Sequence, residues 1–481
     1  MVKDMEEIGC RQSRRTAPDL YGKDVTVMGM GKSGLAATHV LQMLGARVTL
    51  ADEREECASQ QAHASLSSQN IRIGVGKNFP EACQSAEWMI VSPGFPPTHP
   101  QLEMARTRGV RIVGEAEFAS WFFSCPLIAV TGTNGKSTTV TLISQILKAA
   151  EKSIFAGGNL GNPLSLAVPP FVSVAGRHQD SASPFDFIIA EISSFQLETI
   201  ERFHPWLAVL LNLSSDHLNR HPSFSQYCET KKKIFSNQTP EDQALVNMDD
   251  PCVARIADTL SIPLVGLGST GRHAQESVYL NGTTIKARIA GKEWTVMDRD
   301  HIRLRGNHNL TNVFAAIAVA MLCRCPLDII RTVIKTFPGL EHALEFVRDF
   351  HGILFYNDSK GTNIDATVKA LESFQEKIVL IAGGTLKGSD VAPLRDPIRQ
   401  KVKHAILIGA STPQFLETLN GVTTLTTASS LAEAVKVGAD IASPGDVVLL
   451  SPACASFDMF KDYADRGRQF KELVHALPAQ K

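Results

Sequence analysis

Short apolar runs alternate with helical stretches along nearly the whole chain, and this pattern predicts α/β structure. Near the N-terminus the pattern reads strand, helix, strand, strand, strand, at Asp24–Gly29, Ala36–Leu44, Arg47–Ala51, Trp88–Val91 and Val110–Val113. We therefore predict a first α/β domain over residues 1–124, in which residues 1–20 form a polar leader.

The strand–loop–helix pattern then starts again, with a strand at Pro126–Val130 and a helix at Ser137–Ala150. Later strand-like runs at Asp186–Glu191 and Leu207–Asn212 end in polar residues, as parallel strands do where they deliver side chains to a site. A helix at Asn309–Cys323 precedes a Phe-Pro-Gly break, so the middle domain is predicted over residues 125–338. The polar segment Phe171–Pro184 within it has no periodicity, which predicts a surface loop.

The remaining residues, 339–481, are predicted to form a third domain with a parallel α/β layout. Its strand-like runs are Ile353–Asn357, Ile378–Ala382, His404–Gly409 and Val447–Ser451. A chain of 481 residues exceeds what one hydrophobic core usually supports, which agrees with a prediction of three domains.

Charge and cysteine usage narrow the classes of function. The 48 basic residues nearly cancel the 49 acidic ones, so no global positive field favours nucleic acid or an anionic membrane. Nine cysteines without paired CxxC spacing predict free thiols in a reducing compartment. With neither a signal-like apolar segment nor an uncharged run of ~20 apolar residues, we expect a cytoplasmic protein.

A phosphate-binding loop is the strongest single motif. It lies between a predicted strand and a predicted helix and comprises Thr131, Gly132, Thr133, Asn134, Gly135, Lys136, Ser137 and Thr138. Its backbone N–H groups and the helix N-terminus suit phosphates, Lys136 suits the terminal phosphates, and the Ser137 hydroxyl suits Mg²⁺. The middle domain is therefore predicted to be of the P-loop ATPase type.

The first domain carries a Gly29-x-Gly31-x-x-Gly34 sequence after its first strand, and Asp52 ends the next strand. This is the form of a dinucleotide fingerprint and predicts a Rossmann-like domain. The same glycines serve any nucleotide diphosphate, and a purely structural turn remains an alternative.

Further motifs follow the phosphate loop in a fixed order: EISSFQLE at 191–198, Asn212-x-x-x-Asp216-His217, Gly306-x-His308-Asn309-x-x-Asn312, NDSKGT at 357–362 and SPACAS at 451–456. In this order they resemble the Mur ligase family. The resemblance runs from about Gly22 to Gly467, and the GGNLG run at 157–161, EISSFQLE and SPACAS resemble the branch that adds D-glutamate.

The resemblance implies an ATP-dependent amide ligase that forms an acyl phosphate and joins D-glutamate to UDP-N-acetylmuramoyl-L-alanine. It implies two Mg²⁺ ions: Ser137 and Glu191 would hold one, and His217 with a carbamylated Lys231 the other. Lys136, Glu191, His217 and Lys231 are thus the implied catalytic set. Without the resemblance, Lys231-Lys232-Lys233 reads as a solvated basic face. We expect a Rossmann-like third domain and a monomer.

Three further groups of residues match positions that the family uses. For the nucleotide they are Asn309, Asn312, Asp358 and Lys360, which add to the phosphate loop. For the uridine-diphosphate substrate they are Ser33, Asp52, Glu53, Arg54, Ser92, Gly94, Asn159 and His217. For D-glutamate they are Thr362, Lys387, Ser456, Phe457 and Tyr463, of which the two aromatic residues depart from the family's pattern.

Ala343 is a second departure, because the family has arginine after the histidine of this segment. Two hypotheses follow: weaker ATP binding, or a substitute cation nearby. Other Mur ligases and folylpolyglutamate synthase share the ATP loop and are the rivals within the class. A dinucleotide-dependent oxidoreductase fused to an NTPase is the rival from another class, and it leaves Glu191, His217 and Asp358 unexplained.

Overall fold

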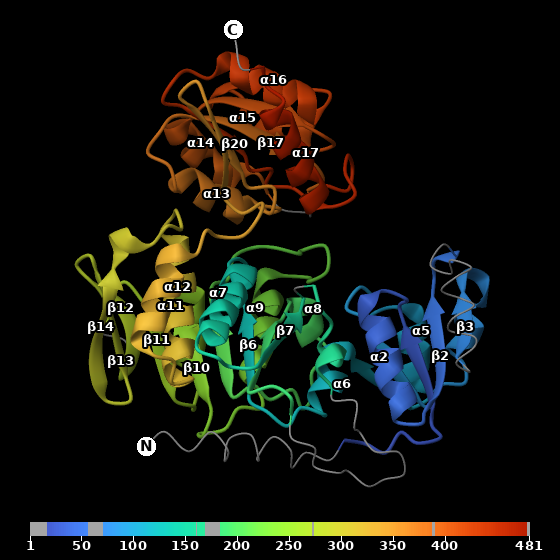
Figure 1. Ribbon diagram of the computed structural model, residues 1–481. Helices are drawn as coiled ribbons and strands as arrows, with labels where there is room; N and C mark the ends of the chain where they lie inside the picture. Colours follow the sequence, from blue (N-terminus) through green and yellow to red (C-terminus); the bar gives the residue numbers. More distant parts are fainter. Residues whose placement is uncertain are drawn as a thin grey trace.

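The computed structural model describes residues 17–55, 71–159, 161–168, 183–271, 274–386 and 390–478. These residues form three lobes, each built on one β-sheet, with the N-terminal and C-terminal lobes on different sides of the central one (Figure 1). The first 16 residues of the predicted leader, residues 171–182 of the predicted loop, and Lys387 lie outside the described residues.

The N-terminal lobe is a parallel sheet in the order β3-β2-β1-β4-β5 in the part of the chain described. Its elements are β1 (Asp24–Met28), α2 (Lys32–Met43), β2 (Arg47–Asp52), β3 (Arg72–Val75), α4 (Phe79–Ala82), β4 (Trp88–Val91), α5 (Pro100–Thr107), β5 (Arg111–Gly114) and α6 (Glu115–Ser120). A Cβ at Gly34 would overlap the Gly29 carbonyl oxygen, so this fingerprint glycine lets α2 pack closely on the β1 turn.

The central lobe has a sheet in the order β14-β13-β12-β11-β10-β9-β6-β8-β7, counted over the described residues. Its elements are β6 (Leu127–Thr131), α7 (Lys136–Ala149), β7 (Ile154–Gly158), η3 (Leu164–Ala167), β8 (Phe187–Glu191), α8 (Ser194–Leu197), β9 (Leu207–Leu210), α9 (Phe224–Lys232), β10 (Gln243–Asn247), α10 (Pro251–Ala257), β11 (Leu264–Gly268), β12 (Glu276–Asn281), β13 (Thr284–Ile289), β14 (Lys292–Asp298), α11 (His308–Leu322) and α12 (Leu327–Thr336). Strands β12 to β14 pair antiparallel, and sequence reasoning did not predict them.

The C-terminal lobe has the sheet order β15-β16-β20-β17-β18-β19 over its described part, parallel except for the edge strand β15. Its elements are β15 (Glu345–Phe350), β16 (Ile353–Asn357), α13 (Ile364–Glu372), β17 (Ile378–Gly383), α14 (Arg395–Lys401), β18 (Val402–Ile408), α15 (Thr412–Leu419), β19 (Thr424–Thr427), α16 (Leu431–Ile441), β20 (Val447–Leu450) and α17 (Tyr463–His475). The predicted three-domain α/β fold is confirmed, while the boundaries at residues 124 and 338 stay predictions.

Helix α6 joins the first lobe to the central one through two buried carboxylates. Glu117 accepts hydrogen bonds from the Trp121 indole and from the backbone N–H groups of residues 201, 202 and 203. Glu115 accepts from the backbone and the hydroxyl of Ser165, and burial raises its pKa. These bonds tie α6 to the central lobe, because buried polar groups are costly to leave unpaired.

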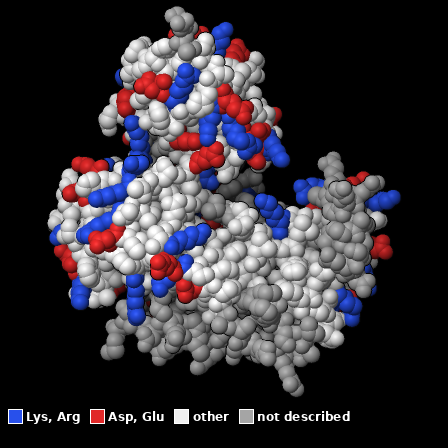
Figure 2. All heavy atoms as spheres, in the orientation of Figure 1, with Lys and Arg blue, Asp and Glu red and all other residues white. Residues whose placement is uncertain are grey.

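In the described residues, the mixed surface charge and the free cysteines agree with the expectations drawn from the composition. Lysine and arginine alternate with aspartate and glutamate over the face seen in Figure 2, and that face is hollowed between the upper and right-hand lobes. The seven cysteines in the described ranges are free thiols. None of the helices in the described ranges combines the length and the apolar character needed to span a bilayer.

Candidate active site

A cavity of about 250 Å³ lies between the central and C-terminal lobes. The phosphate loop and the start of α11 line it from the central lobe, and the β16–α13 segment lines it from the C-terminal lobe. Of the predicted site residues, those on its wall are Thr133, Asn134, Gly135, Lys136, Ser137, Thr138, Asn159, Glu191, His217, Asn309, Asn312, Asp358, Lys360, Thr362 and Tyr463. Residues distant in sequence thus meet at the carboxyl ends of the strands.

The phosphate loop connects β6 to α7 and has two glycines at positive φ, 151° at Gly132 and 86° at Gly135. A Cβ at Gly135 would overlap the Asn312 amide, so glycine is needed for the loop to approach α11. The Lys136 ammonium donates to the carbonyl oxygens of residues 132 and 133 at 2.9 and 2.8 Å. The loop is therefore held in the curled shape that suits a phosphate chain.

Glu191 ends β8 beside the phosphate-loop strand, since Val130 pairs with it in the sheet. Its Oε1 accepts a hydrogen bond of 2.7 Å from the Asn159 amide, whereas Oε2 is buried without a hydrogen-bond partner in the described residues. A carboxylate oxygen left in this way costs free energy unless a cation or a donor approaches it. Ser137 and His217 lie on the same cavity wall, and the oxygen donors of Glu191 and Ser137 suit Mg²⁺.

Lys231 is buried in α9, and its Nζ lies 3.1 Å from the Thr131 hydroxyl. Burial lowers its pKa well below the ordinary value, and the nearby charge of Lys136 lowers it further. The solvated-face interpretation is wrong for this residue, although Lys233 is exposed. Lys231 does not line the cavity, but its charge interacts with Glu191 and Asp216, which do.

Two asparagines at the start of α11 fill the space beside the phosphate loop. The Asn312 amide donates to Asn309 Oδ1 at 2.8 Å, and its own oxygen accepts from the Thr139 hydroxyl. Their neighbour His308 has its pKa lowered to about 4, chiefly by burial. The part of the cavity wall formed by the start of α11 is therefore polar but uncharged at neutral pH.

Asp358 and Lys360 follow β16 and face the loop from the other lobe. The Asp358 carboxylate accepts from the Ser451 hydroxyl at 2.7 Å and from the Leu344 N–H at 3.1 Å. Burial raises its pKa to about 7. The Lys360 ammonium lies 3.3 Å from the Tyr463 hydroxyl.

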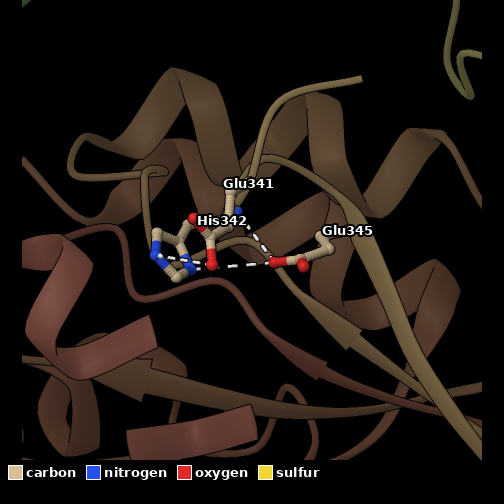
Figure 3. Close-up of side chains that lie close together, drawn as sticks. All are labelled: Glu341, His342 and Glu345. Atoms are coloured by element: carbon tan, nitrogen blue, oxygen red, sulfur yellow. Dashed lines mark hydrogen bonds and ion pairs between the residues drawn. The ribbon is translucent and has the colours of Figure 1, made fainter. Parts of the chain in front are cut away.

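A turn over Glu341–Glu345 carries Ala343, which lines this cavity. The side chains of Glu341, His342 and Glu345 lie close together in the turn (Figure 3). The buried His342 ring accepts from the Asn357 amide at 2.9 Å, and the His342 carbonyl accepts from the Lys360 N–H. Lys471 donates to both glutamates of the turn at 2.8 Å, so a cation already pairs with the carboxylates of this cluster. The turn is anchored on both sides, and Ala343 lies on the cavity wall.

A second cavity, of about 560 Å³, lies between the N-terminal and central lobes. It is lined by every predicted uridine-diphosphate residue except His217, namely Ser33, Asp52, Glu53, Arg54, Ser92, Gly94 and Asn159. Asp52 accepts from the Met30 N–H in the glycine-rich turn at 2.9 Å, and Arg54 pairs with it. Asn159 lines both cavities, so the two adjoin there.

The residues matched to D-glutamate do not all come together. Thr362 and Tyr463 line the first cavity, but Ser456 is buried off its wall and Phe457 is 75% exposed. The structure therefore does not bring Ser456 and Phe457 to the cavity, because the chain turns outward to solvent after the SPACAS run.

Several residues on the wall of the first cavity were given no site role from the sequence, although two of them lie in its motifs; they are Asp216, His308, Asn363, Ala366, Lys369 and Ala370. The last four lie at or after the N-cap of α13 with the spacing of one helix face. That spacing was visible in the sequence, but which face of α13 meets the phosphate loop depends on how the lobes pack.

Family models cover most of the chain. Residues 23–114 match the Mur ligase MurD-like N-terminal domain, residues 130–320 the Mur ligase middle domain, and residues 344–454 the Mur ligase glutamate ligase domain. The UDP-N-acetylmuramoylalanine–D-glutamate ligase of Citrifermentans bemidjiense is 41% identical over 95% of this chain and 98% of its own length. The chain belongs to the Mur ligase family.

Other comparisons agree. The D-glutamate ligase of Trichlorobacter lovleyi is 41% identical over 95% of this chain and 100% of its own length. In fold, the chain resembles UDP-N-acetylmuramate-alanine ligase MurC of Thermotoga maritima, with a TM-score of 0.57 and 18% identity over 95% of this chain and 100% of that one. It also resembles MurF of the same organism in complex with ADP, with a TM-score of 0.55 and 18% identity over 95% of each chain. The oxidoreductase alternative is therefore wrong.

Proposed function

We propose that this chain is the ATP-dependent ligase that adds D-glutamate to UDP-N-acetylmuramoyl-L-alanine in peptidoglycan precursor synthesis. The observation that carries the proposal is the junction of the two cavities at Asn159. One cavity has the phosphate loop and the other the glycine-rich fingerprint, so a sugar nucleotide in the second places its free end toward ATP in the first. The names of the relatives support the same substrates.

The reaction needs an activated carboxylate. The γ-phosphate of ATP passes to the substrate carboxylate to give an acyl phosphate and ADP, and the amine of D-glutamate then displaces phosphate to form the amide. Lys136 and the loop N–H groups hold the phosphate chain in line with the incoming carboxylate. Thr362 and Tyr463 lie on the wall where the amino acid would enter.

Ser137, Glu191 and His217 are the residues that would hold Mg²⁺, and the unpartnered Glu191 Oε2 fits this role. Bound Mg²⁺ would offset phosphate charge as the new bond forms. A buried lysine whose pKa is low presents a neutral amine, the form that adds CO₂ with loss of a proton to give a carbamate. Carbamylated Lys231 would then present a carboxylate that, with His217, holds a second Mg²⁺, in place of a repelling ammonium.

The cellular setting is part of the same proposal. We infer a monomeric, cytoplasmic enzyme that binds neither nucleic acid nor membrane, in line with the net charge of −1 and the free thiols.

The test is phosphate release from ATP in the presence of UDP-N-acetylmuramoyl-L-alanine, with D-glutamate compared against L-glutamate, L-alanine, diaminopimelate and no amino acid. Release stimulated by D-glutamate alone, with a matching amide product, is the expected result. Stimulation by a different amino acid keeps the ligase activity and overturns the D-glutamate assignment. No release with any amino acid overturns the proposed function.

A further inference from the structure

We propose that Lys369 contacts the phosphates of the bound nucleotide and supplies the cation that Ala343 does not supply on the C-terminal wall of the cavity. The inference rests on the proposed function to the extent that ATP occupies the cavity at the phosphate loop. Both residues line that cavity.

Helix α13 aims Lys369 at the cavity. Ala366, Lys369 and Ala370 all line the wall, and their spacing of three and four residues defines one face of a helix. Two alanines beside the lysine leave room for its long side chain to move. The Lys369 side chain is 26% exposed and lines the cavity, so protein covers most of its surface.

The ammonium of Lys369 lies next to the phosphate loop. Oδ2 of Asp365 accepts a hydrogen bond of 2.8 Å from Lys369 Nζ and one of 2.7 Å from the amide of Asn134, a residue of the loop. The Ser214 hydroxyl donates to the same oxygen at 2.9 Å. Because three donors share one oxygen, Lys369 Nζ and the loop residue Asn134 are near neighbours.

A cation at this position offsets a nearby negative charge. The Asp365 carboxylate lies beside the loop, where it would repel a polyphosphate unless a cation offset it. Lys136 reaches the phosphates from the loop itself, where it also bonds to loop carbonyls, Lys360 lies against Tyr463, and His308 is neutral at pH 7 because its pKa is about 4. Among the described residues, Lys369 is the third lysine that lines the cavity. Its flexible side chain lets the ammonium move from Asp365 to a phosphate oxygen.

The turn that carries Ala343 supports the inference that residue 369, in place of residue 343, supplies a cation to the cavity. The turn is held by the His342 ring and by the Leu344 N–H, so an arginine at 343 would extend into the cavity from a fixed base. The cation comes instead from Lys369, which lies on α13 and lines the same cavity as the turn.

The experiment measures the affinity of adenosine, AMP, ADP and a non-hydrolysable ATP analogue, without the other substrates, for the wild type and Lys369→Ala. Loss of one charge-assisted contact is expected to weaken the ATP analogue by about tenfold to a hundredfold and to leave adenosine unchanged. Lys286→Ala is the matched control, because Lys286 is 25% exposed and does not line the cavity. Its Nζ lies 2.8 Å from a carboxylate oxygen of Glu293, so it also loses an ion pair. Equal weakening of adenosine and the ATP analogue overturns the inference.

Two double variants separate a phosphate contact from simple neutralisation of Asp365. Ala343→Arg in the Lys369→Ala background is expected to restore most of the affinity for the ATP analogue. If Asp365→Asn restores it as fully in that background, Lys369 only offsets the carboxylate and the inference is wrong. If the wild type shows D-glutamate-dependent phosphate release but Lys369→Ala binds the ATP analogue as tightly as the wild type, the inference about Lys369 is wrong and the proposed function stands. If the wild type shows no such release, the proposed function itself is wrong.

Discussion

The Asn159 amide donates a hydrogen bond of 2.7 Å to Oε1 of Glu191, where the two cavities adjoin. Asn159 comes from the loop after β7 and Glu191 from the end of β8, and these strands pair in parallel. The bond orients the carboxylate so that its other oxygen is left without a hydrogen-bond partner among the described side chains and backbone. Under the proposed function, Asn159 thus positions a metal ligand while facing the sugar-nucleotide substrate.

Asn159→Ala is expected to lower kcat by about tenfold or more, because loss of a partner that orients a metal ligand usually costs this much. Affinity for ATP should change little, since the loop contacts of Lys136 remain. Steady-state kinetics and nucleotide titration measure the two effects. Asn162→Ala is the control, because Asn162 is exposed in the same loop and its bond to Gly158 uses the backbone carbonyl. Equal kcat in both variants would contradict the role.

Lys231→Ala should lose most of the ligase activity, and short carboxylic acids such as formate or acetate should restore part of it. The expectation follows from the burial of Lys231 and its lowered pKa, which favour the carbamylated form. Activity is measured as D-glutamate-dependent phosphate release over a range of acid concentrations. The adjacent Lys232→Ala, half-buried in the wild type, should retain activity. Wild-type activity in Lys231→Ala would remove the proposed carbamate.

Asp358 should make stability fall as the pH rises from about 4 to about 7. Its pKa is about 7 in the folded protein against an ordinary 3.8, so over this window the folded state binds more protons than the unfolded state. The stabilisation is present below the lower pKa and is lost above the higher one, with a total of roughly 4 kcal/mol. Asp358→Asn keeps an oxygen acceptor and should flatten this part of the profile. Urea unfolding at several pH values checks the slope, and an equal slope in the variant would contradict it.

Glu117→Ala should destabilise the joint between the N-terminal and central lobes by about 3 to 5 kcal/mol. The change leaves the Trp121 indole and three backbone N–H groups without their buried acceptor. Chemical unfolding followed by tryptophan fluorescence reports the loss, since Trp121 lies at the joint. Glu103→Ala, which removes an exposed carboxylate on α5, should have little effect. A similar small effect in both variants would show that the joint does not depend on Glu117.

Most of the strands that deliver site residues could be predicted from the sequence. The strand predicted at Asp186–Glu191 is β8, which begins one residue later, and the helix predicted at Asn309–Cys323 is α11, which begins and ends one residue earlier. The antiparallel strands β12 to β14 were missed because their residues are half exposed, so their apolar positions form no continuous run. Most of the site residues in the motifs were predicted because their motifs follow a strand directly, whereas Asn309 and Asn312 open a helix.

By itself, the sequence determined the α/β class, the phosphate loop, the glycine-rich turn and the family, because these depend on local backbone geometry and on the order of motifs. The tertiary structure decided which side chains meet. It buried Lys231, left Phe457 exposed and placed Lys369 beside the loop, although the sequence alone favoured a solvated Lys231 and did not single out Lys369. The reason is physical: burial, pKa and contact across two lobes depend on how separate sheets pack, and no periodicity along the chain records that packing.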